Sequence, residues 1–237
     1  MWTRGGPSPT RCDGSDSVPA AVQAHSLYRF YRAGDEETLA LQGVSLTVQR
    51  GEFVAVTGPS GSGKSTLLAC LAGMDNPDGG SVCIAGQRIS HRPGSEQARI
   101  RGRHIGMLFE HSNLFDHLTV AQNVAIVHAL TGRRVHIDPS DVLSQLGLSD
   151  RAAAFPSQLS GGELVRAGLA VALANAPTAL LADEPTGELD TVTESLVLGL
   201  LSDTAARGTA VVVASHSPAI TAVAARVVRL DDGRVCS

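Results

Sequence analysis

The chain has 237 residues, of which 43% are hydrophobic, and it carries a formal net charge of −4 at pH 7. This length suits one large domain, or a core with a subdomain, and the composition can build a sizeable buried core. The acidic balance argues against nucleic acid as a partner, because a surface that binds nucleic acid is basic. The sequence has no uncharged apolar run of about 18 residues, so it predicts no membrane-spanning helix.

The N-terminal stretch and the cysteines indicate the expected cellular context. Residues 1–21 are rich in Gly, Pro, Ser and Asp and lack the apolar segment of a signal peptide, so we expect a disordered extension. The cysteines show no short metal-type spacing, and we expect free thiols in a reducing cytosol and no zinc site. They are Cys12, Cys70, Cys83 and Cys236.

Strand-like segments come first in the ordered part of the chain, which is expected over residues 22–237. Residues 22–31 and 41–49 alternate like strands, and 53–58 is a short β-branched run typical of a buried strand. A glycine-rich loop and a helix follow, before a further strand at 81–86.

The sequence from about residue 90 to 160 is mostly helical in pattern, and we expect an inserted helical subdomain there. Helices are predicted near 93–102, 119–130 and 139–146, around one strand at 104–109.

Strands and helices alternate again towards the end of the chain. Apolar strands at 178–183 and 209–215 flank a helix at 192–207, and a strand at 225–230 follows. Such alternation predicts an α/β fold with a largely parallel sheet that is covered by helices on both faces.

Residues 58–65, GPSGSGKS, match the P-loop pattern G-x-x-x-x-G-K-[ST] between a predicted strand and a predicted helix. The loop must be bare because backbone N–H groups converge on phosphate oxygens, and the helix N-terminus adds a favourable field. Lys64 is expected to bridge the β- and γ-phosphates, and Ser65 to ligate Mg²⁺. The flanking elements argue against a chance match, so the sequence predicts an ATP and Mg²⁺ site. The predicted nucleotide contacts in the loop are Gly58, Pro59, Ser60, Gly61, Ser62, Gly63, Lys64, Ser65 and Thr66.

Two strand ends downstream of the P-loop carry further candidates. The strand that ends in Asp183 and Glu184 resembles a Walker B motif, in which Asp183 holds the Mg²⁺ shell and Glu184 orients or deprotonates water. His216 follows the strand at 209–215, at the sheet edge where parallel sheets bind ligands. Taken alone, Asp183 and Glu184 are more simply interpreted as a solvated strand end. Taken alone, His216 is more simply interpreted as a loop histidine.

The stretch LSGGE, residues 159–163, opens a predicted helix. Ser160 and Glu163 have the spacing of a capping box, in which each side chain satisfies a free backbone N–H. Gly161 and Gly162 are poor helix formers, so either a tight turn or close approach by another group must account for them.

The order and spacing of the P-loop, LSGGE, LLADEPTGELD and VVVASHS resemble those of ATP-binding-cassette (ABC) ATPases over about residues 22–237. The stretch 113–124 and the sequence DEPTGELD are similar to the lipoprotein-releasing and macrolide-export group. The resemblance implies a P-loop NTPase core with a mixed, largely parallel sheet, an antiparallel β part and an inserted helical subdomain. It also implies an ATP-hydrolysing subunit that drives a separate integral-membrane permease from the cytoplasmic face of the cell membrane.

The same resemblance assigns roles to residues outside the P-loop. Two copies are expected to pair head to tail, with Ser160, Gly161, Gly162 and Asp190 facing the nucleotide of the other copy. Glu184, His216 and Lys64 are then catalytic, and Ser65, Glu110 and Asp183 hold the metal. Tyr31 is expected to stack on adenine, with Tyr28 as the alternative.

The sequence departs from the family pattern at two places. Glu110 stands where the family usually has Gln, and apolar Leu164, Val165 and Val171 stand where polar or basic side chains are usual. These departures bear on turnover and coupling rather than on nucleotide binding. They leave open a cytosolic ABC ATPase without a transport role, or an ATP-binding switch that hydrolyses slowly. A P-loop kinase is disfavoured, because it would need neither LSGGE nor the residues Leu189 and Asp190 that follow DEPTGE.

Overall fold

The computed structural model describes residues 19–33, 36–111, 113–131 and 138–236. The expected extension at 1–21 falls almost wholly outside the described residues, and it stays a prediction. Within the described residues, no helix is both long and apolar enough to cross a membrane.

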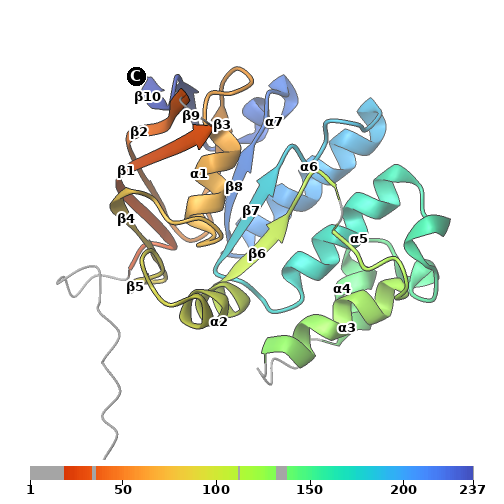
Figure 1. Cartoon of the computed structure of the whole chain (residues 1–237). Coiled ribbons are helices and arrows are strands. Elements are labelled where there is room, and N and C mark those ends of the chain that lie inside the picture. The colour runs from red at the N-terminus through yellow and green to blue at the C-terminus, as the bar shows by residue number, and fades with distance from the viewer. Residues whose placement is uncertain (1–18, 34–35, 112, 132–137, 237) are drawn as a thin grey trace, which may run out of the picture.

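Two sheets organise the molecule (Figure 1). The first is antiparallel and has the strand order β2-β1-β4-β5. Its strands are β1 (Val22–Ala33), β2 (Glu36–Val48), β4 (Gly79–Ile84) and β5 (Gln87–Arg88). The second sheet has the order β10-β9-β3-β8-β7-β6, and all its pairs are parallel except β9 with β10. Its strands are β3 (Phe53–Thr57), β6 (Ile105–Leu108), β7 (Ala179–Asp183), β8 (Ala210–Ala214), β9 (Arg226–Asp231) and β10 (Arg234–Cys236). The predicted mixed, largely parallel architecture is confirmed.

The helices lie on both sides of the larger sheet. They are α1 (Lys64–Leu71), α2 (Gly94–His104), α3 (Val120–Thr131), α4 (Pro139–Gln145), α5 (Gly161–Leu173), α6 (Thr191–Ala206) and α7 (Pro218–Val223). Helix α1 contacts both sheets, whereas α3, α4 and α5 gather at the side away from the antiparallel sheet (Figure 1). These three helices lie between β6 and β7 in the chain. The inserted helical subdomain expected at about 90–160 corresponds to the stretch from α2 to α4, and its status as a subdomain stays a prediction. Helix α7 and strands β5 and β10 were not expected from the sequence.

Alternating side chains of the central strands build two cores. In β7, Ala179 and Leu181 pack into the core that contains α1, and Leu180 and Ala182 pack into the core that contains α5 and α6. Because successive side chains point to opposite faces and both faces are covered, these strands are apolar throughout rather than alternating.

Local signals set several helix ends as expected. The Thr119 N–H donates to Gln122 at 2.9 Å, and the Gln122 N–H donates to the Thr119 hydroxyl at 3.3 Å, which forms the predicted capping box of α3. Gly147, with φ of 66°, follows α4 in the left-handed conformation that commonly ends a helix.

The cysteines only partly follow the expectation. Cys70 and Cys236 are free thiols, but Cys83 is disulfide-bonded, so the prediction of free thiols is wrong for Cys83.

Candidate nucleotide-binding site

A cavity of about 680 Å³ opens beside the P-loop. The cavity is lined by the loop after β3, by the end of β7 and by His216, which follows β8. These segments meet because parallel strands present their carboxyl ends at one sheet edge. Its lining is Tyr31, Ala40, Gly58, Pro59, Ser60, Gly61, Gly63, Lys64, Ser65, Thr66, Glu110, Asp183, Glu184 and His216. Of the predicted P-loop contacts, only Ser62 does not line it, and Ser62 is buried.

The glycines of the loop are fixed by close backbone contacts. A Cβ at Gly58 would lie 2.1 Å from the carbonyl oxygen of Leu230, and a Cβ at Gly63 would lie 2.3 Å from that of Ala40. Both glycines have positive φ, of 152° and 97°. A Cβ at Gly61, by contrast, would meet no atom of the described residues within 4 Å. The chain's own packing therefore requires two of the glycines that phosphate binding also requires.

The Lys64 side chain turns back onto its own loop. Its Nζ donates to the carbonyl oxygen of Gly58 at 2.9 Å and to that of Pro59 at 3.0 Å. Lys64 also lines the cavity, so a phosphate bound there could replace these carbonyl partners.

Asp183 ends β7 with an unsatisfied oxygen. Its Oδ1 is buried and has no hydrogen-bond partner among the described residues. Burial raises the pKa of Asp183 above its usual value, the Ser65 hydrogen bond lowers it, and the charges of Glu184 and Glu110 raise it further. A cation at this place would satisfy the free oxygen and offset the nearby negative charge.

Glu184 is held in a strained position next to Asp183. Its φ is 44°, which is unfavourable for a residue with a side chain, and such strain is typical of functional sites. Ser215 Oγ donates to Oε2 at 2.7 Å, and His216 Nδ1 lies 2.9 Å from Oε1. Ser215 was missed from the sequence, although its place directly after β8, beside β7, could have indicated it.

The LSGGE stretch, residues 159–163 and here termed the signature, opens helix α5 with the predicted capping box. The Ser160 N–H donates to Glu163 Oε2 at 2.8 Å, and the Glu163 N–H donates to the Ser160 hydroxyl at 3.3 Å. Arg151 Nε lies 2.8 Å from Glu163 Oε1, and these contacts lower the pKa of Glu163 to about 2, chiefly through the Ser160 N–H. Neither Ser160 nor the two glycines after it line the P-loop cavity of the same chain.

The two signature glycines differ in their surroundings. A Cβ at Gly162 would lie 2.3 Å from Thr193 Cγ2, whereas the nearest atom to a Cβ at Gly161, Leu189 Cδ2, lies at 4.0 Å. The Thr193 hydroxyl is fixed by Asp190 Oδ2 at 2.6 Å, and Asp190 also caps α6 by accepting from the N–H groups of Val192 and Thr193. Packing within the chain therefore accounts for Gly162, and only Gly161 is open as expected for an approaching phosphate.

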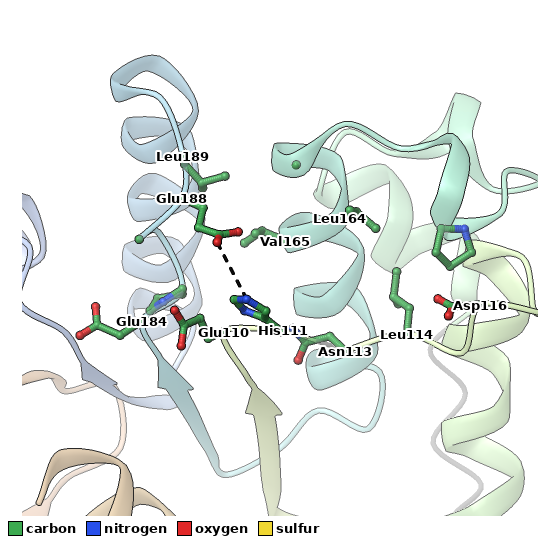
Figure 2. A pocket seen from close by; sticks show the side chains of 14 residues that line it. Glu110, His111, Asn113, Leu114, Asp116, Leu164, Val165, Glu184, Glu188 and Leu189 are labelled. Atoms are coloured by element: carbon green, nitrogen blue, oxygen red, sulfur yellow. Dashed lines mark ion pairs between the residues drawn. The ribbon is translucent and has the colours of Figure 1, made fainter. Parts of the chain in front are cut away.

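A second cavity, of about 370 Å³, lies between the core and α5 (Figure 2). Glu110 and Glu184, which line the P-loop cavity, also line this one, and Leu164 and Val165 line it from α5. The His111 Nε2 and Glu188 Oε1 atoms lie 3.9 Å apart across it. Two of the apolar departures from the family pattern, Leu164 and Val165, thus line the same cavity as the two carboxylates.

Tyr31, rather than Tyr28, belongs to the P-loop cavity. Tyr31 lines the cavity, whereas Tyr28 does not and packs over Gly43 and Gly79. Burial and the hydrogen bond from its hydroxyl to Asp75 raise the pKa of Tyr31, which favours the protonated phenol that donates this bond.

This fold and this loop define the chain as a P-loop nucleotide-binding domain. The family model described as ABC transporter matches residues 41–187. Over 217 residues the chain is 39% identical to the macrolide export ATP-binding/permease protein MacB of Shigella flexneri, an alignment that covers 90% of this chain and 34% of that protein. The dimeric structure of MJ0796, a bacterial ABC transporter cassette, is 33% identical, with a TM-score of 0.83 over 91% of this chain and 97% of that one. A dimeric post-hydrolysis state of MJ0796 bound to ADP and Pi matches equally well, with a TM-score of 0.83.

The chain belongs to the ABC transporter family and is an ABC ATPase domain. It spans about a third of the length of the curated relatives that it matches.

The contact between Gly162 and Thr193 generates a test of the signature loop. We expect Gly162→Ala to destabilise the isolated chain by roughly 1–3 kcal/mol, because a stiff β-branched side chain must move. Gly161→Ala is the matched control and should cause no loss, since its methyl meets open space. Adding Thr193→Ser, which keeps the hydroxyl and removes the methyl, should restore the stability of Gly162→Ala. Urea unfolding of the four forms checks this, and equal midpoints for the two glycine variants would contradict it.

Proposed function

We propose that this domain binds ATP with Mg²⁺ in the P-loop cavity and hydrolyses it with Glu184 as the base. The observation that carries the proposal is the convergence of the bare loop, Lys64, Asp183 and Glu184 on one cavity. The backbone N–H groups of the loop and the N-terminus of α1 would hold the phosphates, and Lys64 would add a fixed positive charge.

The residues present fit a magnesium ion. The buried Asp183 Oδ1 has no partner among the described residues, Ser65 forms a hydrogen bond with Asp183, and Glu110 lines the same cavity. These are hard oxygen ligands of the kind that Mg²⁺ binds together with phosphate oxygens and water. When bound, Mg²⁺ would neutralise negative charge on the phosphates. Ser65, Asp183 and Glu110 would hold it there.

Glu184 is the residue best placed to activate water. Its carboxylate oxygens are directed by Ser215 and His216, so the side chain is already oriented before any substrate binds. A carboxylate held in this way can accept a proton from a water that attacks the terminal phosphate. The exposed ring of His216, anchored through Nδ1, can present Nε2 towards the same phosphate.

The second half of the site would come from another copy of the domain. Ser160, Gly161, Gly162 and Asp190 do not line the P-loop cavity of their own chain, and Gly161 has open space beside it. The N-terminus of α5 could therefore meet the terminal phosphate bound by a second copy. The dimeric form of the similar MJ0796 cassette supports such a head-to-tail pair.

We expect this ATPase cycle to drive a membrane permease. The name of the MacB relative combines an ATP-binding part with a permease part, and this chain aligns with about a third of that protein. Closure and opening of the pair would drive the permease through the helical insert, with the domain held at the cytoplasmic face of the membrane.

Labelling of Lys64 tests phosphate binding directly, because Lys64 is the only lysine in the sequence. Amine-acylating reagents should modify only Lys64 and the α-amino group. We expect MgATP to protect Lys64, since the ammonium exchanges its two carbonyl partners for phosphate oxygens, and to leave the α-amino group reactive. Peptide mass spectrometry measures both sites in one sample. Lys64→Ala should also abolish ATP binding in equilibrium measurements, and unprotected labelling with unchanged binding would refute the P-loop assignment.

Removing the proposed base should separate binding from hydrolysis. Glu184→Gln keeps the shape and deletes the base, so ATP binding should persist while the rate falls by about 10²–10⁴-fold. The variant should accumulate as an ATP-bound dimer, seen by light scattering with MgATP. Detection of monomer alone would show that the head-to-tail pair does not form from this domain by itself.

Glu110 should slow the reaction relative to a neutral amide. Its charge is close enough to help raise the pKa of Asp183, and a carboxylate on the metal weakens the pull of the metal on phosphate. We expect slow basal turnover, and faster turnover in Glu110→Gln at saturating Mg²⁺. Asp116→Asn is a matched control, because Asp116 lines the second cavity but not the P-loop cavity. Equal or slower turnover of Glu110→Gln would show that this carboxylate does not limit the rate.

A further inference from the structure

Tyr31 is fixed on two sides by charged neighbours. Its hydroxyl donates to Asp75 Oδ2 at 2.8 Å, and the guanidinium carbon of Arg29 lies 4.7 Å from the centroid of its ring. Arg29 Nε donates to the same Asp75 oxygen at 2.8 Å, which closes a triangle of three side chains. The phenol is therefore held in position even though 40% of Tyr31 is exposed.

The triangle joins two parts of the fold that are far apart in the sequence. Arg29 and Tyr31 lie on β1, and Asp75 lies in the turn that follows α1. That turn is itself tied to β1, because Asp78 Oδ2 accepts from the Phe30 N–H at 2.8 Å and from Arg29 Nη1 at 3.0 Å. Helix α1 begins at Lys64, so the ring is anchored to the same helix whose N-terminus faces the P-loop cavity.

The arrangement leaves one side of the ring for a ligand. Tyr31 lines the P-loop cavity, whereas neither Arg29 nor Asp75 does. The Arg29 guanidinium lies over the ring, where a cation is attracted by the ring quadrupole, and Arg29 does not line the cavity. A flat aromatic ligand can stack on the exposed side without having to order the phenol first, because Asp75 and Arg29 have already fixed it.

We propose that Arg29 and Asp75 are positioning residues that hold Tyr31 as a platform for the nucleotide base and set its distance from the phosphate site. The inference rests on the proposed binding of ATP in the P-loop cavity. It adds that recognition of the base depends on an ion pair that does not touch the nucleotide. Since the Asp75 N–H donates to the Ala69 carbonyl oxygen at 3.2 Å, the base platform is tied to α1, whose N-terminus faces the phosphate site.

Comparison of ATP with inorganic tripolyphosphate isolates the platform, because tripolyphosphate can occupy only the phosphate part of the site. In the full chain, we expect Arg29→Gln and Asp75→Asn to weaken ATP binding about three- to tenfold, the scale of one exposed cation–π contact or one hydrogen bond. Their affinity for tripolyphosphate should equal that of the unmodified chain. Tyr31→Ala should abolish the preference for ATP over tripolyphosphate, and Arg29→Lys should restore part of what Arg29→Gln loses.

Arg226→Gln is the matched control for loss of an arginine–carboxylate pair. Arg226 Nε lies 2.7 Å from Glu52 Oε1, and neither residue lines the P-loop cavity, so both affinities should stay unchanged. In steady-state assays, Arg29→Gln and Asp75→Asn should raise KM for ATP and leave kcat unchanged.

Each other outcome has a distinct meaning. Parallel loss of ATP and tripolyphosphate affinity would show that Arg29 and Asp75 support the fold rather than the platform, and would overturn the inference. Unchanged ATP affinity in Tyr31→Ala, or in both ion-pair variants, would also overturn it, while phosphate binding at Lys64 would still stand. Failure of the unmodified chain to bind either compound would instead refute the proposed function.

Discussion

Close approach of backbone to backbone around the P-loop is the constraint on which the rest of the site depends. Gly58 lies against the Leu230 carbonyl of β9, and Gly63 lies against the Ala40 carbonyl of β2, with no room for a side chain at either place. The loop is therefore held between the larger sheet and the antiparallel sheet. Its bare N–H groups converge only when both sheets have formed, so the phosphate site is a property of the whole fold.

The carboxylates beside the loop lie between two cavities. Glu110 and Glu184 line both the P-loop cavity and the cavity next to α5, and Ser215 with His216 fixes Glu184 from the adjoining strand end. The P-loop cavity and the cavity next to α5 thus share two carboxylates.

The signature loop is supported from within its own chain. Asp190 caps α6 and holds Thr193, whose methyl group fills the place where a side chain at Gly162 would lie. Gly161 remains open next to it. The same five-residue motif therefore serves two purposes. One glycine lets α5 pack closely on α6, and the other leaves backbone N–H groups accessible.

Most elements of the fold, and the residues of the P-loop and Walker B strand, could be predicted from the sequence. Local patterns suffice there, because apolar periodicity, capping spacing and glycine placement act over a few neighbouring residues. The capping boxes at Thr119 and Ser160 are clear cases, since both partners lie three residues apart.

Contacts between distant residues could be decided only by the tertiary structure. The support of Glu184 by Ser215 and the reason for Gly162 each depend on a partner from another element. Their physical cause is packing at interfaces where the facing atoms are dozens of residues away in the chain. Sequence by itself determined where the bare loop and the two adjoining carboxylates lie in the chain, and the fold determined which side chains hold these groups in place.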